Sequence, residues 1–156
     1  MANTSVVLTP EELLEHWQGH RRVTRRLIDA FPEQEFFNYS VGGMRPFGQL
    51  ATELLRMAVP IAEGVATGNW VDRKIEPKTK SEVIGLWDAD TEALNRIWKT
   101  IPEHRFQEVD TAFGQWKGNG IWMILYAIDN EVHHRGQGYV YLRALGAEPP
   151  AFYDRS

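Results

Sequence analysis

The sequence predicts an all-α protein, a four-helix bundle with long loops between the helices. Four stretches repeat apolar residues every three or four positions, which is the spacing of one face of a helix. Each stretch is bounded by capping residues, proline or glycine, which mark where helices begin and end. At 156 residues the chain fits one domain, residues 1–156, and its long loops allow crossover connections between the helices.

The first helix is predicted from Thr9 to about Phe31. Thr9 can cap the helix, and Glu12 completes a Thr-x-x-Glu capping box around Pro10 in the first turn. Pro32 then stops the helix. Four arginines lie away from the apolar stripe, and we interpret them as a solvated face that pairs with glutamates, with an anion site as the less favoured alternative: Arg21, Arg22, Arg25 and Arg26.

The second helix is predicted to open at residues 45–47 and to end near Thr67-Gly68. Pro60 lies late in this stretch and is expected to kink the helix or to end it early, because proline removes a backbone donor. Glu53 lies at the edge of the apolar arc, from which its side chain can reach inward.

The third helix is predicted from a second capping box, Thr79 to Glu82, to Ile101 just before Pro102. Its acidic residues lack the glycine and the final glutamate of a calcium loop, so we interpret Asp88, Asp90 and Glu92 as a solvated face. Residues 104–117 alternate loosely and hold Gly114, which predicts a long loop with room for a short hairpin.

The fourth helix is predicted between the starting signal Gly118-Asn119-Gly120 and a C-terminal cap at Gly146, with the tail 147–156 lying back along the bundle. Gly136 and Gly138 each cost a helix about 1 kcal/mol relative to alanine, so we interpret them as marks of close packing or functional approach. One predicted face carries Ile121, Ile124, Leu125, Ile128, Val132, Tyr139 and Leu142, and the opposite face carries Met123, Tyr126, Asn130, His134, Gln137 and Tyr141.

The composition excludes several classes of function. There is no cysteine, which rules out disulfides, thiolate nucleophiles and cysteine-based zinc sites. The net charge of −4, without a basic block, argues against a nucleic-acid partner. No apolar run is long enough for a membrane span, and residues 1–5 lack the charged start of a signal peptide, so a cytoplasmic protein is expected. No serine lies in a Gly-x-Ser-x-Gly elbow.

Candidate chemistry gathers on the fourth helix. Asn130 and His134 are at i and i+4, one above the other, and such a pair can grip a metal whose third ligand comes from a facing helix. Glu131 and His134 have the Glu-x-x-His spacing of carboxylate-bridged metal bundles, but no second copy of that motif is present. The alternative interpretation is a structural, hydrogen-bonded histidine pair.

The run His133-His134-Arg135-Gly136-Gln137, followed by Tyr141-Leu142-Arg143, Gly146 and Pro149-Pro150, resembles the C-terminal signature of the DinB-like (YfiT-like) family. Residues 45–50, Arg-Pro-Phe-Gly-Gln-Leu, resemble the start of that family's second helix. The resemblance implies an up-and-down four-helix bundle with one mononuclear metal, related to mycothiol- and bacillithiol-dependent enzymes. It covers most of the chain.

In the family, three histidines typically hold the metal, one from the second helix and two from the fourth. The resemblance places these ligands at Glu53, Asn130 and His134, so only one histidine is kept. One carboxylate, one amide and one imidazole make a weaker set, for which manganese, nickel, zinc or iron remain candidates. The alternative is a metal-free polar pocket in which Glu53 pairs with His134. Gln49, Glu131 and His133 are further pocket candidates, and no catalytic residue is assigned.

Two functions follow from the resemblance. The first is a metal-dependent transferase or hydrolase that acts on a small molecule or a low-molecular-weight thiol. The second is a non-enzymatic ligand-binding or stress-associated bundle that has lost the metal. Because both faces of the fourth helix carry groups that need partners, a homodimer is also predicted.

Overall fold

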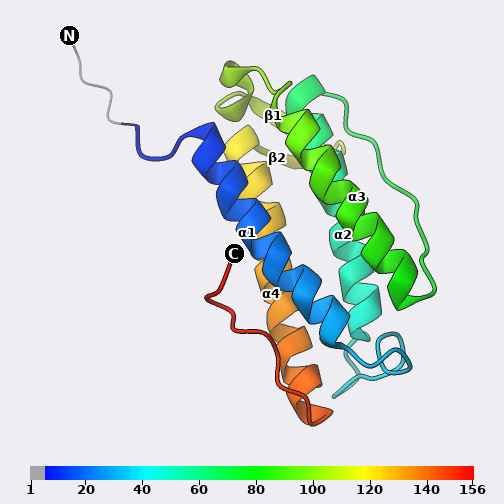
Figure 1. The fold of residues 1–156 in the computed structure, drawn as a ribbon. Coiled ribbons are helices and arrows are strands. Elements are labelled where there is room, and N and C mark those ends of the chain that lie inside the picture. Colours follow the sequence, from blue (N-terminus) through cyan, green and yellow to red (C-terminus); the bar gives the residue numbers. More distant parts are fainter. Residues whose placement is uncertain (1–5) are drawn as a thin grey trace.

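The computed structural model describes residues 6–156 and contains four long helices and one hairpin (Figure 1). The expectation about a signal peptide at residues 1–5 lies outside this range. The four-helix, all-α architecture predicted from the sequence is confirmed. The elements in chain order are α1 (Pro10–Ala30), α2 (Phe47–Thr67), α3 (Lys80–Trp98), the 3₁₀ turn η1 (Glu103–Phe106), β1 (Val109–Ala112), β2 (Trp116–Asn119) and α4 (Gly120–Ala144).

The helix starts are as predicted. The Thr9 hydroxyl accepts from the Glu12 backbone at 3.1 Å, and the Glu12 carboxylate accepts from the Thr9 backbone at 2.8 Å. Thr79 and Glu82 form the same capping box on α3. One helix end differs from prediction, because α3 stops at Trp98 rather than Ile101. The second helix ends at Thr67, as predicted, and it continues through Pro60 rather than ending there. The predicted hairpin is present, with Val109 opposite Asn119.

The connection between α2 and α3 crosses the length of the bundle, so these two helices run parallel (Figure 1). In the up-and-down order that the family resemblance implied, they would be antiparallel. The start of α3 lies at the end of α1, where the Lys80 ammonium donates to the Phe31 carbonyl at 2.9 Å. Phe31 in turn stacks on Phe47 at the start of α2. Twelve extended residues span about 40 Å, which is enough to pass a 21-residue helix of about 30 Å.

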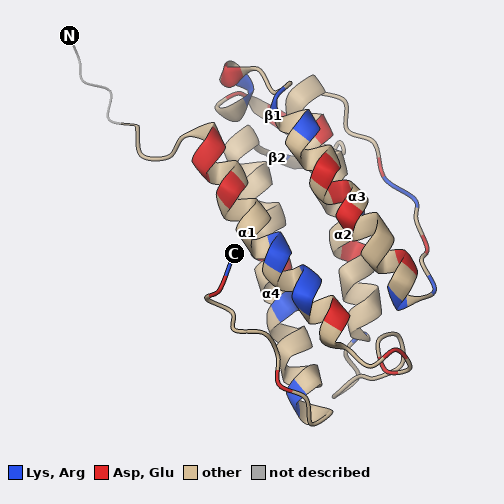
Figure 2. Cartoon of the chain, viewed as in Figure 1, with Lys and Arg blue, Asp and Glu red and all other residues tan. Residues whose placement is uncertain are grey.

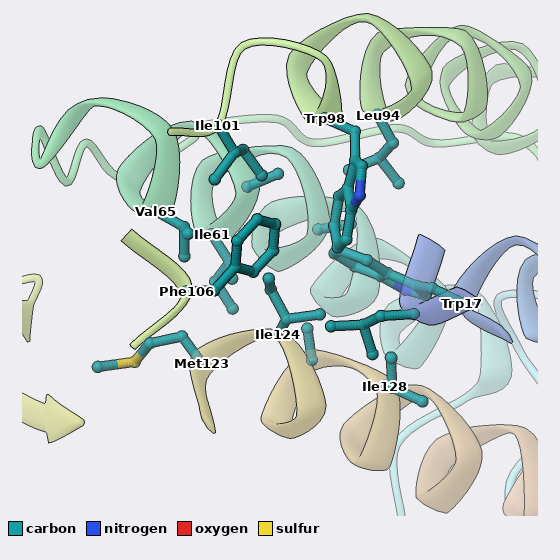
Figure 3. Close-up of a cluster of buried hydrophobic side chains, with 14 of the residues drawn as sticks. Trp17, Ile61, Val65, Leu94, Trp98, Ile101, Phe106, Met123, Ile124 and Ile128 are labelled. Atoms are coloured by element: carbon teal, nitrogen blue, oxygen red, sulfur yellow. The ribbon is translucent and has the colours of Figure 1, made fainter. Parts of the chain in front are cut away.

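The apolar core forms two clusters along the bundle. The first surrounds Trp17, Ile61, Trp98 and Ile124, which point toward one another from all four helices (Figure 3). The second surrounds Phe31, Phe47, Leu55, Trp87 and Leu142. Along α1 and α4, buried polar residues lie between the clusters: Gln18, His20, Arg21, Thr24, Glu131, His134 and Arg135.

Both predicted faces of α4 contribute buried residues. Leu125 and Val132, from the apolar face, are 37% and 39% exposed, while Glu131 and His134 are buried. The buried positions still recur every three or four residues, but three of them are polar. Because apolar residues occur on both sides of this helix, their periodicity alone did not identify the side that packs against α1 and α2.

Two charged residues assigned to solvated faces are buried instead. Arg21 is 1% exposed and donates to the Trp87 carbonyl at 2.9 Å, with its guanidinium 4.2 Å from the centre of the Trp87 ring. Asp90 is 3% exposed and accepts from Arg73 at 2.6 Å. Arg25 remains on the surface, where it pairs with Asp88.

The C-terminal tail lies back along the bundle as predicted (Figure 1). Arg22 and Arg26 of α1 donate to backbone carbonyls of Arg155 and Ser156, both at 2.7 Å. Acidic and basic residues are mixed along α1 and α3 in the view of Figure 2, without a single-sign face. Among residues 6–156, none of the helices combines the length and the apolar character that crossing a membrane requires.

Candidate functional site

Helices α2 and α4 bring the three predicted ligand residues together. Glu53 lies on α2, and its Oε1 is 3.0 Å from His134 Nε2 and 3.3 Å from Asn130 Nδ2 on α4. His134 is nearly enclosed, with a side-chain exposure of 7%, whereas Glu53 keeps 31% exposure toward solvent. The i, i+4 spacing on α4 therefore aligns Asn130 and His134 against one carboxylate.

Two further residues complete this cluster, which we call the polar centre: Arg45, Glu53, Asn130, His134 and Gln137. Arg45 Nη1 donates to Glu53 Oε2 at 2.5 Å. Gln137 Oε1 lies 2.8 Å from His134 Nδ1. Gln137 could be anticipated, because it shares a helix face with His134 three residues earlier. Arg45 could not, because it precedes α2 and no motif connects it with Glu53.

The hydrogen bonds of the polar centre hold its imidazole and its carboxylate in place. His134 is bonded at both ring nitrogens, to Gln137 at Nδ1 and to Glu53 at Nε2. Burial alone would raise the pKa of Glu53, but the hydrogen bonds from Arg45 and His134 outweigh it, and this pKa lies below its ordinary value of 4.5. The Arg45 guanidinium and the Glu53 carboxylate thus form an ion pair in the centre.

The donor set of the polar centre does not fit a tightly held divalent metal. Arg45 already binds the one carboxylate, and its positive charge opposes a second cation there. Asn130 directs its amide nitrogen, which is not a ligand atom, toward Glu53 and toward the Met57 sulfur at 3.2 Å. Among residues 6–156, no group of three or more histidine, aspartate or glutamate side chains could hold an ion. The Arg45 guanidinium provides the positive charge that the Glu53 carboxylate faces.

The lowered pKa of Glu53 predicts how stability changes with pH. A carboxylate whose folded pKa is depressed stabilises the fold above its unfolded pKa, and this stabilisation is lost as the pH falls through the folded value. We expect Glu53→Gln to reduce the free energy of unfolding by about 1 to 2 kcal/mol at pH 7. Urea titrations should show the difference from wild type shrinking below pH 4.5. A difference that grows in acid would contradict the assignment.

The other predicted pocket residues are scattered. Gln49 is exposed at the mouth of a cavity that also contains Arg45 and Glu53. His133 is exposed beside His134, with 5.1 Å between the ring centres. Glu131, proposed from the Glu-x-x-His spacing, does not reach the cavity. It points into the bundle and accepts from the Thr24 hydroxyl at 2.6 Å.

Glu131 belongs to the buried polar layer instead. Burial raises its pKa, and the charge of Arg21 and the bond from Thr24 oppose that effect. Arg135 donates to the His20 carbonyl at 3.0 Å and to His20 Nδ1 at 2.9 Å. Burial first, and then the charge of Arg135, lower the pKa of His20 to about 4. His20 is therefore neutral at pH 7, and this layer ties α1 to α4.

Two neighbouring cavities lie beside the polar centre, each with a volume of about 510 Å³. The polar cavity is lined mainly by charged and amide side chains: Arg45, Gln49, Glu53, Arg56, Glu76 and Lys78. The second, which we call the aromatic cleft, lies between α2, α4, the hairpin and residues 72–76. Arg56 and Glu76 line both. The cleft was not predictable from the sequence, because its walls come from four separate segments.

Comparison with known proteins identifies the fold and the family. Over 148 residues the chain is 24% identical to the protein YjoA of Bacillus subtilis strain 168, covering 92% of this chain and 96% of YjoA. The crystal structure of YjoA, a DinB-like protein, superposes with a TM-score of 0.75 at 22% identity, over 90% of this chain and 96% of that one. A DinB-like protein from Bacillus cereus ATCC 10987 has a TM-score of 0.73 at 18% identity, over 92% of this chain and 97% of that one.

A more distant structural neighbour is a mutant of a mycothiol-dependent maleylpyruvate isomerase. Its TM-score is 0.65 at 13% identity, over 84% of this chain and 61% of that chain. At these identities the structural likeness shows a shared fold. The model of the DinB family matches residues 1–156. This chain belongs to the DinB family.

Proposed function

We propose that this protein binds a small molecule in the polar cavity beside α2, without a metal, and that the polar centre recognises one end of it. The observation that carries this proposal is the Glu53 carboxylate, whose two oxygens are bonded to Arg45 and His134. An ion pair within the protein thus occupies the position that the family resemblance assigns to a metal. The centre opens directly into the polar cavity through Arg45 and Glu53.

The charges favour a ligand with an acidic group. Three basic residues line the polar cavity against two acidic ones, which leaves a net positive charge: Arg45, Arg56 and Lys78 against Glu53 and Glu76. The Arg45 side chain is 50% exposed and uses one donor on Glu53, so its other N–H groups can bind a carboxylate from the cavity. Lys78 lines the same cavity. A low-molecular-weight thiol that carries a carboxylate fits this description, as does any small organic acid.

A metal-dependent transferase or hydrolase is the function that the family resemblance suggested first. It requires a metal that polarises the substrate or activates a bound water or thiol. The amide at Asn130 and the arginine beside Glu53 oppose such a site. We therefore assign no catalytic step to these residues. The homodimer and the cytoplasmic location stay predictions, and light scattering at micromolar concentration tests the former.

Elemental analysis decides between the two functions. We expect untagged wild-type protein to carry far less than one equivalent of metal, even after incubation with manganese, nickel, zinc or iron and desalting. His134→Ala should carry no less than wild type, because both ring nitrogens of His134 are bonded to protein groups, Gln137 and Glu53, and not to a metal. A near-stoichiometric metal that disappears in His134→Ala would overturn the proposal and support the metal-dependent function.

A further inference from the structure

The aromatic cleft is lined by rings from two segments of the chain. Phe113 and Trp116 come from the hairpin, and Trp122 and Tyr126 come from the first two turns of α4. Trp116, Trp122 and Tyr126 are 52%, 46% and 51% exposed. Single exposed apolar residues are ordinary, but four aromatic rings around one cleft expose a large apolar surface to water and mark a binding site.

The rings on α4 are held in place before any ligand binds. Trp122 and Tyr126 are one turn apart and stack with 5.9 Å between ring centres and 21° between planes. The Trp122 ring also covers Gly118, where an added Cβ would lie 2.6 Å from Trp122 Cε3. Gly118 therefore leaves the space that this ring fills. A binding surface that is already ordered loses little conformational entropy when it is occupied.

The hairpin rings and two methionines complete the lining of the aromatic cleft. Phe113 packs edge-on against Trp116, with 6.2 Å between ring centres and 76° between planes. Met57 and Met123 line the cleft from α2 and α4. Thioether sulfurs make favourable contacts with the edges of aromatic rings and adapt to their shape. The aromatic cleft has a volume of about 510 Å³, which suits a ligand of a few fused rings.

We propose that the aromatic cleft binds the flat aromatic body of a small molecule, between the hairpin rings and the α4 rings. Offset stacking and edge-to-face contacts need a planar π-system, so a saturated molecule of the same size binds more weakly. This inference rests on the proposed small-molecule function and names the class of its ligand. Because Arg56 and Glu76 line both cavities, an acidic group on the same ligand can extend toward Arg45.

The test uses the six tryptophan indole N–H signals in NMR spectra of ¹⁵N-labelled protein. Adding 2-naphthol, a flat uncharged probe, should shift the signals of Trp116 and Trp122. The signals of Trp17 and Trp87, buried in the two core clusters, should stay in place. Decahydro-2-naphthol, which is saturated, should bind at least about fivefold more weakly, because ring–ring contacts contribute about 0.5–1.5 kcal/mol beyond buried area.

Matched variants distinguish binding in the aromatic cleft from nonspecific binding to exposed aromatic rings elsewhere on the surface. Trp122→Leu should raise the Kd for 2-naphthol at least about fivefold, while Tyr153→Leu, which removes an exposed ring of the tail, should leave it unchanged. The proposal is overturned if 2-naphthol moves no cleft indole, if the saturated analogue binds equally well, or if both variants behave alike. The wild-type shifts keep the test decisive even where Trp122→Leu folds poorly.

A third probe tells this inference apart from the proposed function. If the polar centre recognises an acidic group, 2-naphthoate should bind more tightly than 2-naphthol, and Arg45→Gln should abolish that preference. Equal binding of the two probes, with the cleft indoles shifted, overturns acid recognition and leaves the aromatic cleft supported. No binding of either probe overturns the cleft, and it leaves the elemental analysis of the polar centre as an independent result.

Discussion

Replacing Arg21 by alanine is expected to lower the free energy of unfolding by about 3 to 5 kcal/mol, because the change leaves a buried carboxylate without its main counter-charge. Arg21 is 1% exposed, bonded to the Trp87 carbonyl and packed on the Trp87 ring. Its charge is the largest influence opposing the burial of Glu131. The substitution also opens a cavity in the middle of the bundle.

Arg25→Ala is the matched control, one turn further along the same face of α1. Arg25 pairs with Asp88 at 2.8 Å, but both side chains are partly exposed, at 33% and 56%. Surface pairs of this kind contribute about 0.2–1 kcal/mol, so urea titrations should show a small loss. Similar losses for the two variants would mean that Arg21 is not the buried partner of Glu131.

Gly138→Ala and Gly136→Ala are expected to change stability in opposite directions. A Cβ at Gly138 would lie 2.6 Å from Phe47 Cε2 and 2.9 Å from Leu27 Cδ2, both in the second core cluster. Such overpacking costs about 1–3 kcal/mol, which offsets or exceeds the gain of about 1 kcal/mol from better helix propensity. At Gly136 nothing lies within 4 Å, so alanine should stabilise the protein by that same gain.

Thermal unfolding of the two glycine variants, monitored by circular dichroism, measures this difference. We expect the midpoint of Gly136→Ala to rise and that of Gly138→Ala to fall relative to wild type. If the two midpoints move together, α4 does not pack on α2 through Gly138. The sequence marked both glycines for close packing or functional approach, and the structure shows close packing at Gly138 but not at Gly136.

Features set by neighbouring residues were predictable from the sequence. The capping boxes at Thr9 and Thr79 involve residues three apart, and the C-terminal cap at Gly146 adopts the positive φ of 81° that favours glycine. The proximity of Asn130 and His134 followed from helix geometry. The family resemblance predicted that both residues lie close to Glu53, because it placed Glu53 on the side of α2 that faces α4.

Features set by distant partners were not predictable. Arg21 and its bonding partner Trp87 are 66 positions apart, and Arg73 reaches Asp90 from a loop. A charged residue in a helical pattern is ordinarily at the surface, and only the tertiary arrangement of α1, α3 and α4 provides the partners that keep these charges inside. Arg45 is a similar case, since its contact with Glu53 depends on how the chain enters α2.

The crossover between α2 and α3 gives the protein a region where binding can change independently of folding. Residues 72–76 line the aromatic cleft and residues 76–78 line the polar cavity, yet this segment belongs to none of the four helices. Its length is fixed by the distance it must cross, whereas Asp72, Lys74 and Lys78 are exposed and free of the core. Substitutions at these positions can therefore change the walls of both cavities while the packing of the helices stays intact, so the ligand preference that we propose can vary on one scaffold.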